Sequence, residues 1–448
     1  MNPKMKVPTI EDIASMWHVS GLKDKLIFTF LIIALFRLGT HIPLFGIDTG
    51  VFKQIIESGQ GGNIIGFLDL FSGGALGRVS IFALGIGPYI TASIIMQLLA
   101  AAIPSLEKLQ KDEGEDGRRK LSQYTRLFTT ALAFFQSFVL MTYLTRINAL
   151  QVDSIFSLTF LGSVFTLTTG SIFIMWLAEL VTERGIGNGG SILIFVGIIA
   201  GIPFYMERTG QLIAGQPAMQ LAFVLLLLVF LATIVLIVIM QEAMRKVIIV
   251  NARRQVGNKV YGGVNTHIPF KLNPGGVMPI IFAVAILLFP TTILSVAGQA
   301  NIPEGIFKNI IEFASVHLLN PGGFVYYILY FLLIVTLTFF YASIMPNMQP
   351  KEIAQNLKKY GSSIPGIKPG KPTADVLEKI LSRTTFIGAM GLGIIALIPG
   401  LATSITGITP LQGIGATALI IMVGVALDFI NQIKTHLLAR QYEGFLKQ

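Results

Sequence analysis

The sequence predicts an all-α polytopic membrane protein with ten transmembrane helices. Charged residues make up 12% of the 448 residues, whereas 53% are hydrophobic and the mean hydropathy is +0.72. An ordinary soluble domain has about 25% charged residues, so a soluble protein could not cover this much apolar surface. The apolar residues also gather into stretches long enough to cross a hydrocarbon core about 30 Å thick. The ten stretches are 22–44, 79–102, 124–144, 157–180, 189–206, 217–241, 275–297, 322–345, 381–399 and 409–428.

Residues 1–21 precede the first stretch and are expected to stay on the cytoplasmic side. They contain Glu11 and Asp12 and lack the short apolar core of a cleavable signal peptide. Their apolar residues recur at helical spacing, at Ile10, Ile13, Ala14 and Trp17. This pattern predicts an amphipathic helix that lies at the membrane interface.

The distribution of lysine and arginine predicts the orientation, because positively charged loops are retained in the cytoplasm. With a cytoplasmic N-terminus, 27 of the 33 basic residues lie on the cytoplasmic side. The six outside are Arg37, Lys53, Arg78, Arg146, Arg208 and Lys308. We therefore expect both termini in the cytoplasm, and a basic cytoplasmic face that also attracts anionic lipids.

The second stretch is interrupted. Residues 71–103 run from a glycine-rich segment through Arg78 into an apolar span that contains further glycine and a proline. Non-helical backbone at membrane depth leaves polar groups that lipid cannot satisfy, so it persists only beside protein or a water-filled cavity. The break therefore indicates a polar pathway close to this segment.

Five spans lie on each side of the 206–217 loop, which divides the chain into halves at 22–206 and 207–428. Because five is odd, the second half must start from the opposite side of the membrane. This parity is required for an inverted-topology repeat, in which the pathway commonly follows the interface between the halves. Residues 429–448 form the expected cytoplasmic tail.

Two cytoplasmic connections, 242–274 and 346–380, are long and polar, as functional loops usually are. The second includes a segment rich in proline and glycine, which predicts fixed turns rather than a flexible tether. Both loops are basic and are expected to dock a large partner, either RNA or an acidic protein. Their candidate docking cations are Arg245, Lys246, Arg253, Arg254, Lys259, Lys358, Lys359 and Lys368.

No catalytic, metal or cofactor site is predicted. The chain has no cysteine, and its five histidines include no HExxH pair. The GxGxxG match at 185–190 connects two apolar spans, so it predicts a tight interhelical turn, and residues 366–373 miss the P-loop spacing. Three charged residues near span ends are interpreted as anchors, since a long side chain can reach the interface and a carboxylate can meet headgroups or loop cations: Arg37, Glu179 and Asp428.

Motifs along the whole chain resemble the SecY family, the protein-conducting channels of the general secretory translocon. The resemblance is carried by RLGTHIPLFGID (37–48), SGGALGRVSIFALGIGPYITASIIMQLL (72–99), GEDGRRKLSQYTR (114–126), TERGIGNGGSILIFVGIIAGIP (182–203), YGGVNTHIPFKLN (261–273), KYGSSIPGIKPGKPT (359–373) and VALDFINQIKTHLLARQYEGFLK (425–447). It implies ten helices in two inverted five-helix halves around a pore, with a seam that opens sideways into lipid.

The resemblance also implies a plug, a short re-entrant helix at residues 64–77 that blocks the resting pore. Its central glycines and the abrupt transition after it indicate a loosely held element. The expected plug residues are Phe67, Leu70, Phe71, Ser72, Gly73, Gly74 and Arg78.

By the same resemblance, a ring of branched aliphatic side chains closes the pore. The matching positions are Ile86, Ile90, Ile194, Ile281 and Ile421. An apolar ring stops ions by dewetting and can yield around a passing chain. The sequence departs from the family pattern at Gly190, where a branched aliphatic is usual, and at Lys368, where an arginine is usual.

Polar Thr91 and Gln136 match positions at the lateral gate, where interhelical hydrogen bonds hold the seam shut. The implied function is a passive channel for secretory polypeptides that also releases membrane segments sideways into lipid. The implied partners are SecE, SecG, the SecA ATPase, the ribosome with its RNA and proteins, and signal peptides with nascent secretory or membrane proteins. The expected location is the bacterial plasma (inner) membrane, although a plastid-encoded origin would look the same.

Two other classes of function remain open. A secondary transporter of small solutes would also use a broken helix and two halves, but few charged residues lie within the spans to couple an ion gradient. An intramembrane hydrolase would need a nucleophile and a base facing one cavity, and no such pair is apparent in the sequence.

Overall fold

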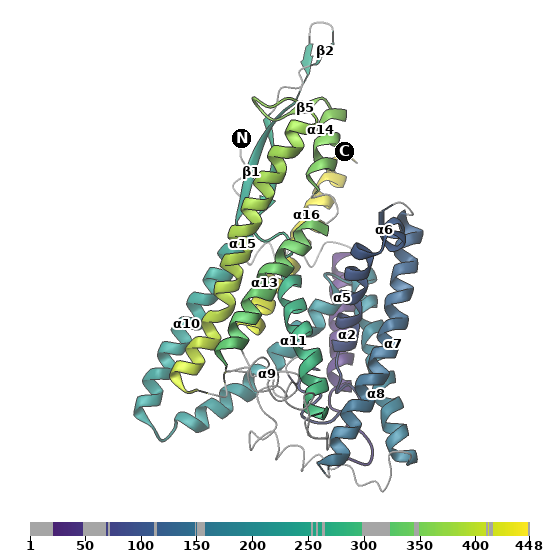
Figure 1. Cartoon of the computed structure of the whole chain (residues 1–448), viewed down its shortest axis with the longest axis vertical. Helices are drawn as coiled ribbons and strands as arrows, with labels where there is room; N and C mark the ends of the chain where they lie inside the picture. The colour runs from purple at the N-terminus through teal and green to yellow at the C-terminus, as the bar shows by residue number, and fades with distance from the viewer. Residues whose placement is uncertain are drawn as a thin grey trace, which may run out of the picture. The chain divides into compact units, whose positions relative to one another are not determined.

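A computed structural model of the chain describes residues 21–47, 69, 72–111, 114–147, 149, 157–251, 254–256, 259–261, 265–297, 323–344, 349–408, 411 and 415–446. The predicted amphipathic helix and the expected residues Phe67, Leu70, Phe71 and Arg253 lie outside these residues. Within the described part, helices dominate and a few short strands lie at one end of the second half (Figure 1).

Ten long helices in this part each overlap one predicted span. They are α2 (Leu22–Gly39), α5 (Gly87–Ala102), α7 (Gly114–Arg146), α8 (Leu158–Arg184), α9 (Gly189–Ile213), α10 (Pro217–Glu242), α11 (Met278–Ala297), α13 (Phe324–Ile344), α15 (Lys371–Thr406) and α16 (Ala416–Leu446). Seven contain a stretch that is long and apolar enough to cross a membrane: α7, α8, α9, α10, α13, α15 and α16. Two short helices, α6 (Pro104–Lys111) and α14 (Pro350–Lys359), complete the helical elements.

The loop predicted between the two halves is much shorter than expected. Helix α9 continues through the polar run after residue 206 and ends at Ile213, and α10 begins at Pro217. Polar residues lower the hydropathy without ending a helix, whereas a proline disfavours helical backbone in the residue before it. The prediction of a loop over 206–217 is therefore wrong for residues 206–213.

The chain forms two compact units. The first comprises Met1–Glu207, Ser295–Ala300 and Val425–Gln448, and the second comprises Arg208–Leu294 and Asn301–Gly424. Within the first unit, α7 packs against both α5 and α8. Within the second, α15 packs against α10 and α13.

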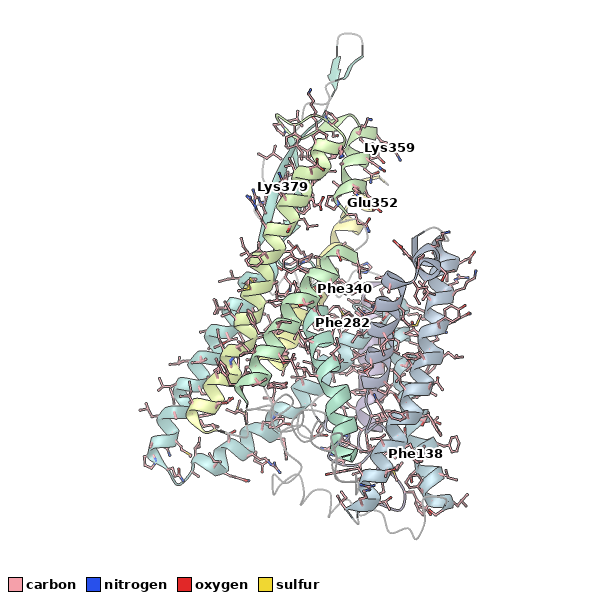
Figure 2. The ribbon with its side chains drawn as sticks, in the orientation of Figure 1. Phe138, Phe282, Phe340, Glu352, Lys359 and Lys379 are labelled. Carbon is pink, nitrogen blue, oxygen red and sulfur yellow. The ribbon has the colours of Figure 1, made fainter. Side chains whose placement is uncertain are left out.

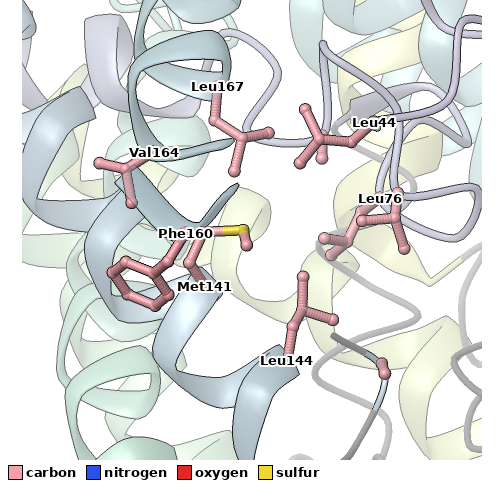
Figure 3. Packing of buried hydrophobic residues seen from close by; sticks show 10 residues of the cluster. Leu44, Leu76, Met141, Leu144, Phe160, Val164 and Leu167 are labelled. Carbon is pink, nitrogen blue, oxygen red and sulfur yellow. The ribbon is translucent and has the colours of Figure 1, made fainter. Parts of the chain in front are cut away.

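An apolar cluster fills the first unit where α7 ends and α8 begins. Met141 and Leu144 of α7 meet Phe160, Val164 and Leu167 of α8 (Figure 3). Residues Leu44, Leu76 and Val79, which belong to non-helical segments, complete the cluster. These segments are thus held by side-chain packing as well as by hydrogen bonds.

The predicted loop 242–274 is a small antiparallel structure instead. Strand β1 (Met244–Asn251) pairs with β4 (Asn265–Lys271), with Val247 opposite Ile268, and β2 (Arg254–Val256) pairs with β3 (Lys259–Tyr261). Strand β5 (Ser362–Ser363) adds to the other edge of β1, so the sheet order is β4-β1-β5. The two long loops are therefore joined in one sheet.

Candidate functional site

The predicted break in the second span is present. Helix α5 begins only at Gly87, and residues 72–86, together with Asp69, form the segment that we call the turn segment. Gly73, Gly74 and Gly85 have φ angles of +72°, +82° and +57°, which favour glycine. Val79 has a φ of +44°, an uncommon conformation for a β-branched residue.

The turn segment satisfies its backbone by pairing with the chain that follows α2. The amide of Leu44 donates to the carbonyl of Val79 at 2.9 Å, and the amide of Ile81 donates to the carbonyl of Ile42 at 3.0 Å. Between them, Pro43 and Ser80 form an antiparallel bridge. Non-helical backbone between two membrane helices is therefore hydrogen-bonded to protein, as such a break requires.

The carboxylate of Asp69 organises the start of the turn segment. Its Oδ1 accepts the amide of Gly77 at 2.6 Å and the hydroxyl of Ser72 at 3.4 Å, and its carbonyl accepts the amide of Gly74 at 2.9 Å. The Ser72 hydroxyl in turn accepts the amide of Leu76 at 3.0 Å. Burial raises the pKa of Asp69 above 3.8, although the Gly77 amide, the Ser72 hydroxyl and the charge of Arg78 oppose the rise.

Arg37 of α2 joins the turn segment to the helix before it. Its Nη1 donates to the carbonyl of Gly73 at 2.6 Å, and a Cβ at Gly73 would lie 3.1 Å from the Cα of Gly197 on α9. The side chain of Arg37 is thus held by protein, and its role as an interfacial anchor stays a prediction. Glu179 of α8 meets a cation, as expected for a carboxylate near a span end: its Oε1 accepts from Nε of Arg126 on α7 at 2.9 Å.

The described plug positions are held firmly. Ser72 and Gly73 are buried, Gly74 is half-buried and Arg78 is exposed. Next to them, Leu76 and Val79 belong to the apolar cluster of α7 and α8. Hydrogen bonds and packing thus hold the described residues 72–77, and the loosely held plug over 64–77 stays a prediction.

Three of the five expected ring residues lie in the first unit. Ile86 caps α5 at its N-terminus and is 2% exposed, and the amide of Ile90 donates to its carbonyl at 3.1 Å. A Cβ at Gly190 would lie 3.5 Å from the Cδ1 of Ile86, an ordinary contact. Ile194 follows Gly190 by one helical turn on α9, so both lie on the same face of that helix. The structure thus places the departure from the family pattern directly beside Ile86.

The other two ring residues, Ile281 of α11 and Ile421 of α16, are buried in the second unit. The neighbouring turns of these helices touch, because a Cβ at Gly424 would overlap the Cγ2 of Val277. Val277 precedes Ile281 by one turn, and Gly424 follows Ile421 by about one turn. A close contact therefore lies within about one turn of each of these two ring residues.

The two expected gate residues lie on neighbouring helices of the first unit. Thr91 of α5 donates its hydroxyl to the carbonyl of Gly87 within its own helix, at 3.1 Å. Gln136 of α7 is half-buried. Both side chains are partly accessible, and no hydrogen bond between them is seen.

The sheet, α14 and the first turns of α15 form what we call the sheet domain. Its core consists of Val247 of β1, Phe270 of β4, Ile364 and Leu377, with α14 contributing Ile353. Phe270 is 1% exposed. The two basic loops therefore fold together around a shared apolar core, which was not expected from the sequence.

The sheet domain presents its cations to solvent. Figure 2 shows Lys359 of α14 and Lys379 of α15 at the same end of the second unit, with Glu352 nearby. Arg254 and Lys259 lie on β2 and β3, respectively. The other described candidate cations are exposed: Arg245, Lys246, Lys358, Lys359 and Lys368.

Lys368 is presented by a fixed turn. The hydroxyl of Thr373 donates to the carbonyl of Lys368 at 2.8 Å, and Gly366 and Gly370 on either side have φ angles of +78° and +107°. This geometry confirms the predicted turns in the second loop. It holds the backbone at Lys368 in a fixed conformation while the ammonium group remains in water.

The glycine-rich match at 185–190 is the tight interhelical turn that was predicted. Helix α8 ends at Arg184, α9 begins at Gly189, and a Cβ at Gly189 would overlap the carbonyl oxygen of Ala178. The amide of Gly187 donates to Oε1 of Gln432 at 2.6 Å. Among the described residues, no group of three histidine, cysteine, aspartate or glutamate side chains could hold a metal ion.

Comparison with known proteins identifies the family. The SecY family model matches residues 80–430. Protein translocase subunit SecY of Synechocystis sp. is 46% identical over 447 residues, which cover 99% of this chain and 98% of that protein.

Solved structures agree on the fold. A SecY structure whose report describes a plug domain that stabilises the closed channel aligns with a TM-score of 0.65 at 19% identity, covering 97% of this chain and 94% of that one. Sec61 in the canine ribosome-channel complex aligns with a TM-score of 0.61 at 16% identity, with 97% and 94% covered. The fold is thus the all-α, ten-helix channel fold with a plug. By its sequence match over nearly the whole length, the chain belongs to the SecY family of protein translocase subunits.

Proposed function

We propose that this chain is the central pore-forming subunit of a Sec translocase, a passive channel for secretory polypeptides that releases membrane segments sideways into lipid. The observation that carries the proposal is the turn segment. It places non-helical, protein-bonded backbone immediately before α5, where the family has its plug and the first ring residue. A chain that only needed to cross the membrane would not require such a break.

In this proposal, the branched side chains Ile86, Ile90, Ile194, Ile281 and Ile421 form the constriction. They carry no charge and have no hydrogen-bonding side-chain atom, so they discriminate little between passing sequences. Residues 64–77 form the plug, which is anchored at its C-terminal end by Arg37 and Asp69. Thr91 and Gln136 line the lateral gate.

We propose that the sheet domain docks the partner that drives translocation, either the SecA ATPase or the translating ribosome. Its exposed lysines and arginines favour phosphates and acidic faces. A ribosome partner is supported by the Sec61 structure, which was solved in a ribosome-channel complex. SecE and SecG are the proposed membrane partners, and the bacterial inner membrane, with both termini in the cytoplasm, is the proposed location.

The chain itself is proposed to perform no covalent chemistry, which agrees with its membership of a channel family. Energy then comes from the docked partner. A solute transporter is not favoured, because few charged residues lie within the spans to couple an ion gradient.

Crosslinking tests the pore directly, because the chain has no cysteine of its own. A cysteine at Ile281 should form a disulfide with a single cysteine in a secretory precursor arrested during passage. The same cysteine at Leu228, an exposed residue of α10, is the control. A crosslink that requires the precursor's signal segment supports the channel. If none of the five ring positions crosslinks to a precursor that is demonstrably arrested, the pore assignment is wrong.

A further inference from the structure

A pair of side-chain amides, one buried and one half-buried, lies where the sheet domain joins the membrane helices of the second unit. The Nδ2 of Asn273 donates to Oε1 of Gln241 at 3.4 Å and to the carbonyl of Gly276 at 2.6 Å. Gln241 belongs to the last turn of α10, and Asn273 precedes α11. Asn273 is 1% exposed. The bond to Gly276 fixes which end of the Asn273 amide is the donor.

This pair continues the β1/β4 ladder toward the helices. Met244 is opposite Lys271 at the end of the ladder, and the amide of Leu272 donates to the carbonyl of Ala243 at 2.9 Å beyond it. Asn273 follows Leu272, and its side chain bonds to that of Gln241, which lies two residues before Ala243. The β1/β4 pair, which we call the hairpin, is therefore joined by hydrogen bonds to the end of α10 and to the segment before α11.

Helices α15 and α16 pack tightly against the pair. A Cβ at Gly388 of α15 would overlap the carbonyl oxygen of Leu272, and one at Gly424 of α16 would lie 3.5 Å from Nε2 of Gln241. Of the described buried side-chain atoms, three have no hydrogen-bond partner: Gln241 Nε2, Asn273 Oδ1 and Thr385 Oγ1. Unpaired buried polar atoms are unfavourable, so apolar side chains would be better here if stability alone mattered.

The position of the pair bears on the constriction. Asn273 is four residues before Val277, whose carbonyl accepts the amide of Ile281 at 3.2 Å, and Val277 packs against Gly424. A translation of α11 along its axis, relative to the hairpin, would therefore move Ile281 relative to Ile421.

We propose that Gln241 and Asn273 are positioning residues that couple the β1/β4 hairpin of the sheet domain to the constriction. They fix the position of α11 relative to β1 and β4. In this way they set where Ile281 lies along the helix axis relative to Ile421. The role in the constriction rests on the proposed function, whereas the register itself does not. Polar groups that fix one arrangement at the expense of stability are a known means of specifying register.

A designed disulfide measures the register. The Cβ of Val277 lies 3.6 Å from the position of a Cβ at Gly424, which is within the range of a disulfide, and Val277→Cys removes the overlapping methyl group. In the Val277→Cys/Gly424→Cys chain we expect rapid oxidation. Gln241→Met, which keeps the length but removes the amide, should slow it about threefold, the factor for one average hydrogen bond between membrane helices.

Two further variants keep the test decisive. Thr233→Val removes a fully buried hydroxyl elsewhere on α10, where it donates to the carbonyl of Val229 at 2.7 Å. It should leave the oxidation rate unchanged. Asn273→Ala should slow oxidation, and adding Gln241→Met to it should slow it no further. An unchanged rate in Gln241→Met, or an equal slowing by Thr233→Val, would overturn the proposal.

The link to the constriction is tested separately, by the leak of a small solute from vesicles that contain the cysteine-free variants. Gln241→Met should raise the leak and Thr233→Val should not. A slower disulfide with an unchanged leak would overturn the role in the constriction. If the proposed function itself were wrong, Ile281 would fail to crosslink to an arrested precursor while the disulfide result would stand.

Discussion

The turn segment and the sheet domain both interrupt the series of helices, yet they satisfy their backbones differently. The turn segment relies on glycines with positive φ, on one carboxylate and on pairing with residues 42–44. The sheet domain uses a regular ladder over an apolar core and presents its cations to water. Backbone groups away from water must find their partners in the protein, whereas backbone groups of an exposed strand can also bond to water.

The largest effect is expected from Phe270→Ala in the sheet domain. Phe270 is 1% exposed in a small core, and such truncations cost about 3 to 5 kcal/mol. We expect the sheet domain to become sensitive to protease while the membrane helices stay intact. His267→Ala, on the exposed face of the same strand, is the matched control. Equal protease resistance in both variants would mean that the apolar core does not hold this domain together.

The second largest effect is expected from Asp69→Ala in the turn segment. The substitution leaves the amide of Gly77 without its acceptor, and an unsatisfied donor away from water costs about 1 to 3 kcal/mol. The midpoint of thermal unfolding in lipid nanodiscs should fall clearly below that of Asp375→Ala, which changes an exposed carboxylate on α15. Similar midpoints would show that the turn segment does not depend on this carboxylate.

The same residue predicts a dependence on pH. Because burial raises the pKa of Asp69 above 3.8, the folded chain holds this proton to higher pH than the unfolded chain does. The contribution of Asp69 to stability is therefore complete below pH 3.8 and is lost as the pH rises through the raised pKa. Asp69→Asn should remove this part of the pH profile of the unfolding midpoint. A profile identical to that of the parent chain would contradict the prediction.

A smaller effect is expected from Gly190→Val beside the turn segment. The new side chain would contact Ile86, and burying one or two methyl groups contributes about 1 kcal/mol to the closed state. Solute leak through reconstituted channels should fall. Gly210→Val on the same helix, where a Cβ meets nothing within 4 Å, is the control for changed helix propensity. If both variants leak equally, Gly190 does not border the constriction.

The smallest effect on stability is expected from Lys368→Ala, because this side chain is exposed. If it contacts a ribosomal phosphate, the slope of log affinity against log salt for ribosome binding should become shallower by about 1. Lys368→Arg should strengthen binding, because the guanidinium group offers two parallel donors. Lys108→Ala, an exposed lysine on α6, should change neither.

Hydropathy was sufficient to predict the ten helices, because each apolar span must cross the same thickness of lipid. It did not predict the sheet domain. The alternation of buried Val247 and Ile249 with exposed Ile248 is visible in the sequence only once the strand is known. The pairing of Val250 with Ser363 joins residues more than a hundred positions apart, and no local pattern specifies such a contact.

The same limit applies to the candidate site. The break before α5 was predictable from its glycines and proline. The partner of Arg37 was not, because the carbonyl of Gly73 becomes a suitable acceptor only when the glycine adopts a positive φ. The amide pair of Gln241 and Asn273 was missed for a related reason, since both residues look like ordinary polar flanks of apolar spans.

The hydrogen bonds of the turn segment have a consequence for the order of biosynthesis. The partners of residues 72–81 in these bonds are Arg37, Ile42, Leu44, Asp69 and other residues of the segment itself. All of them are synthesised before or together with the segment. The turn segment can therefore complete these bonds as it leaves the ribosome, before α7 and α8 arrive to pack against it. The backbone groups of this non-helical segment therefore have partners that do not depend on the later helices.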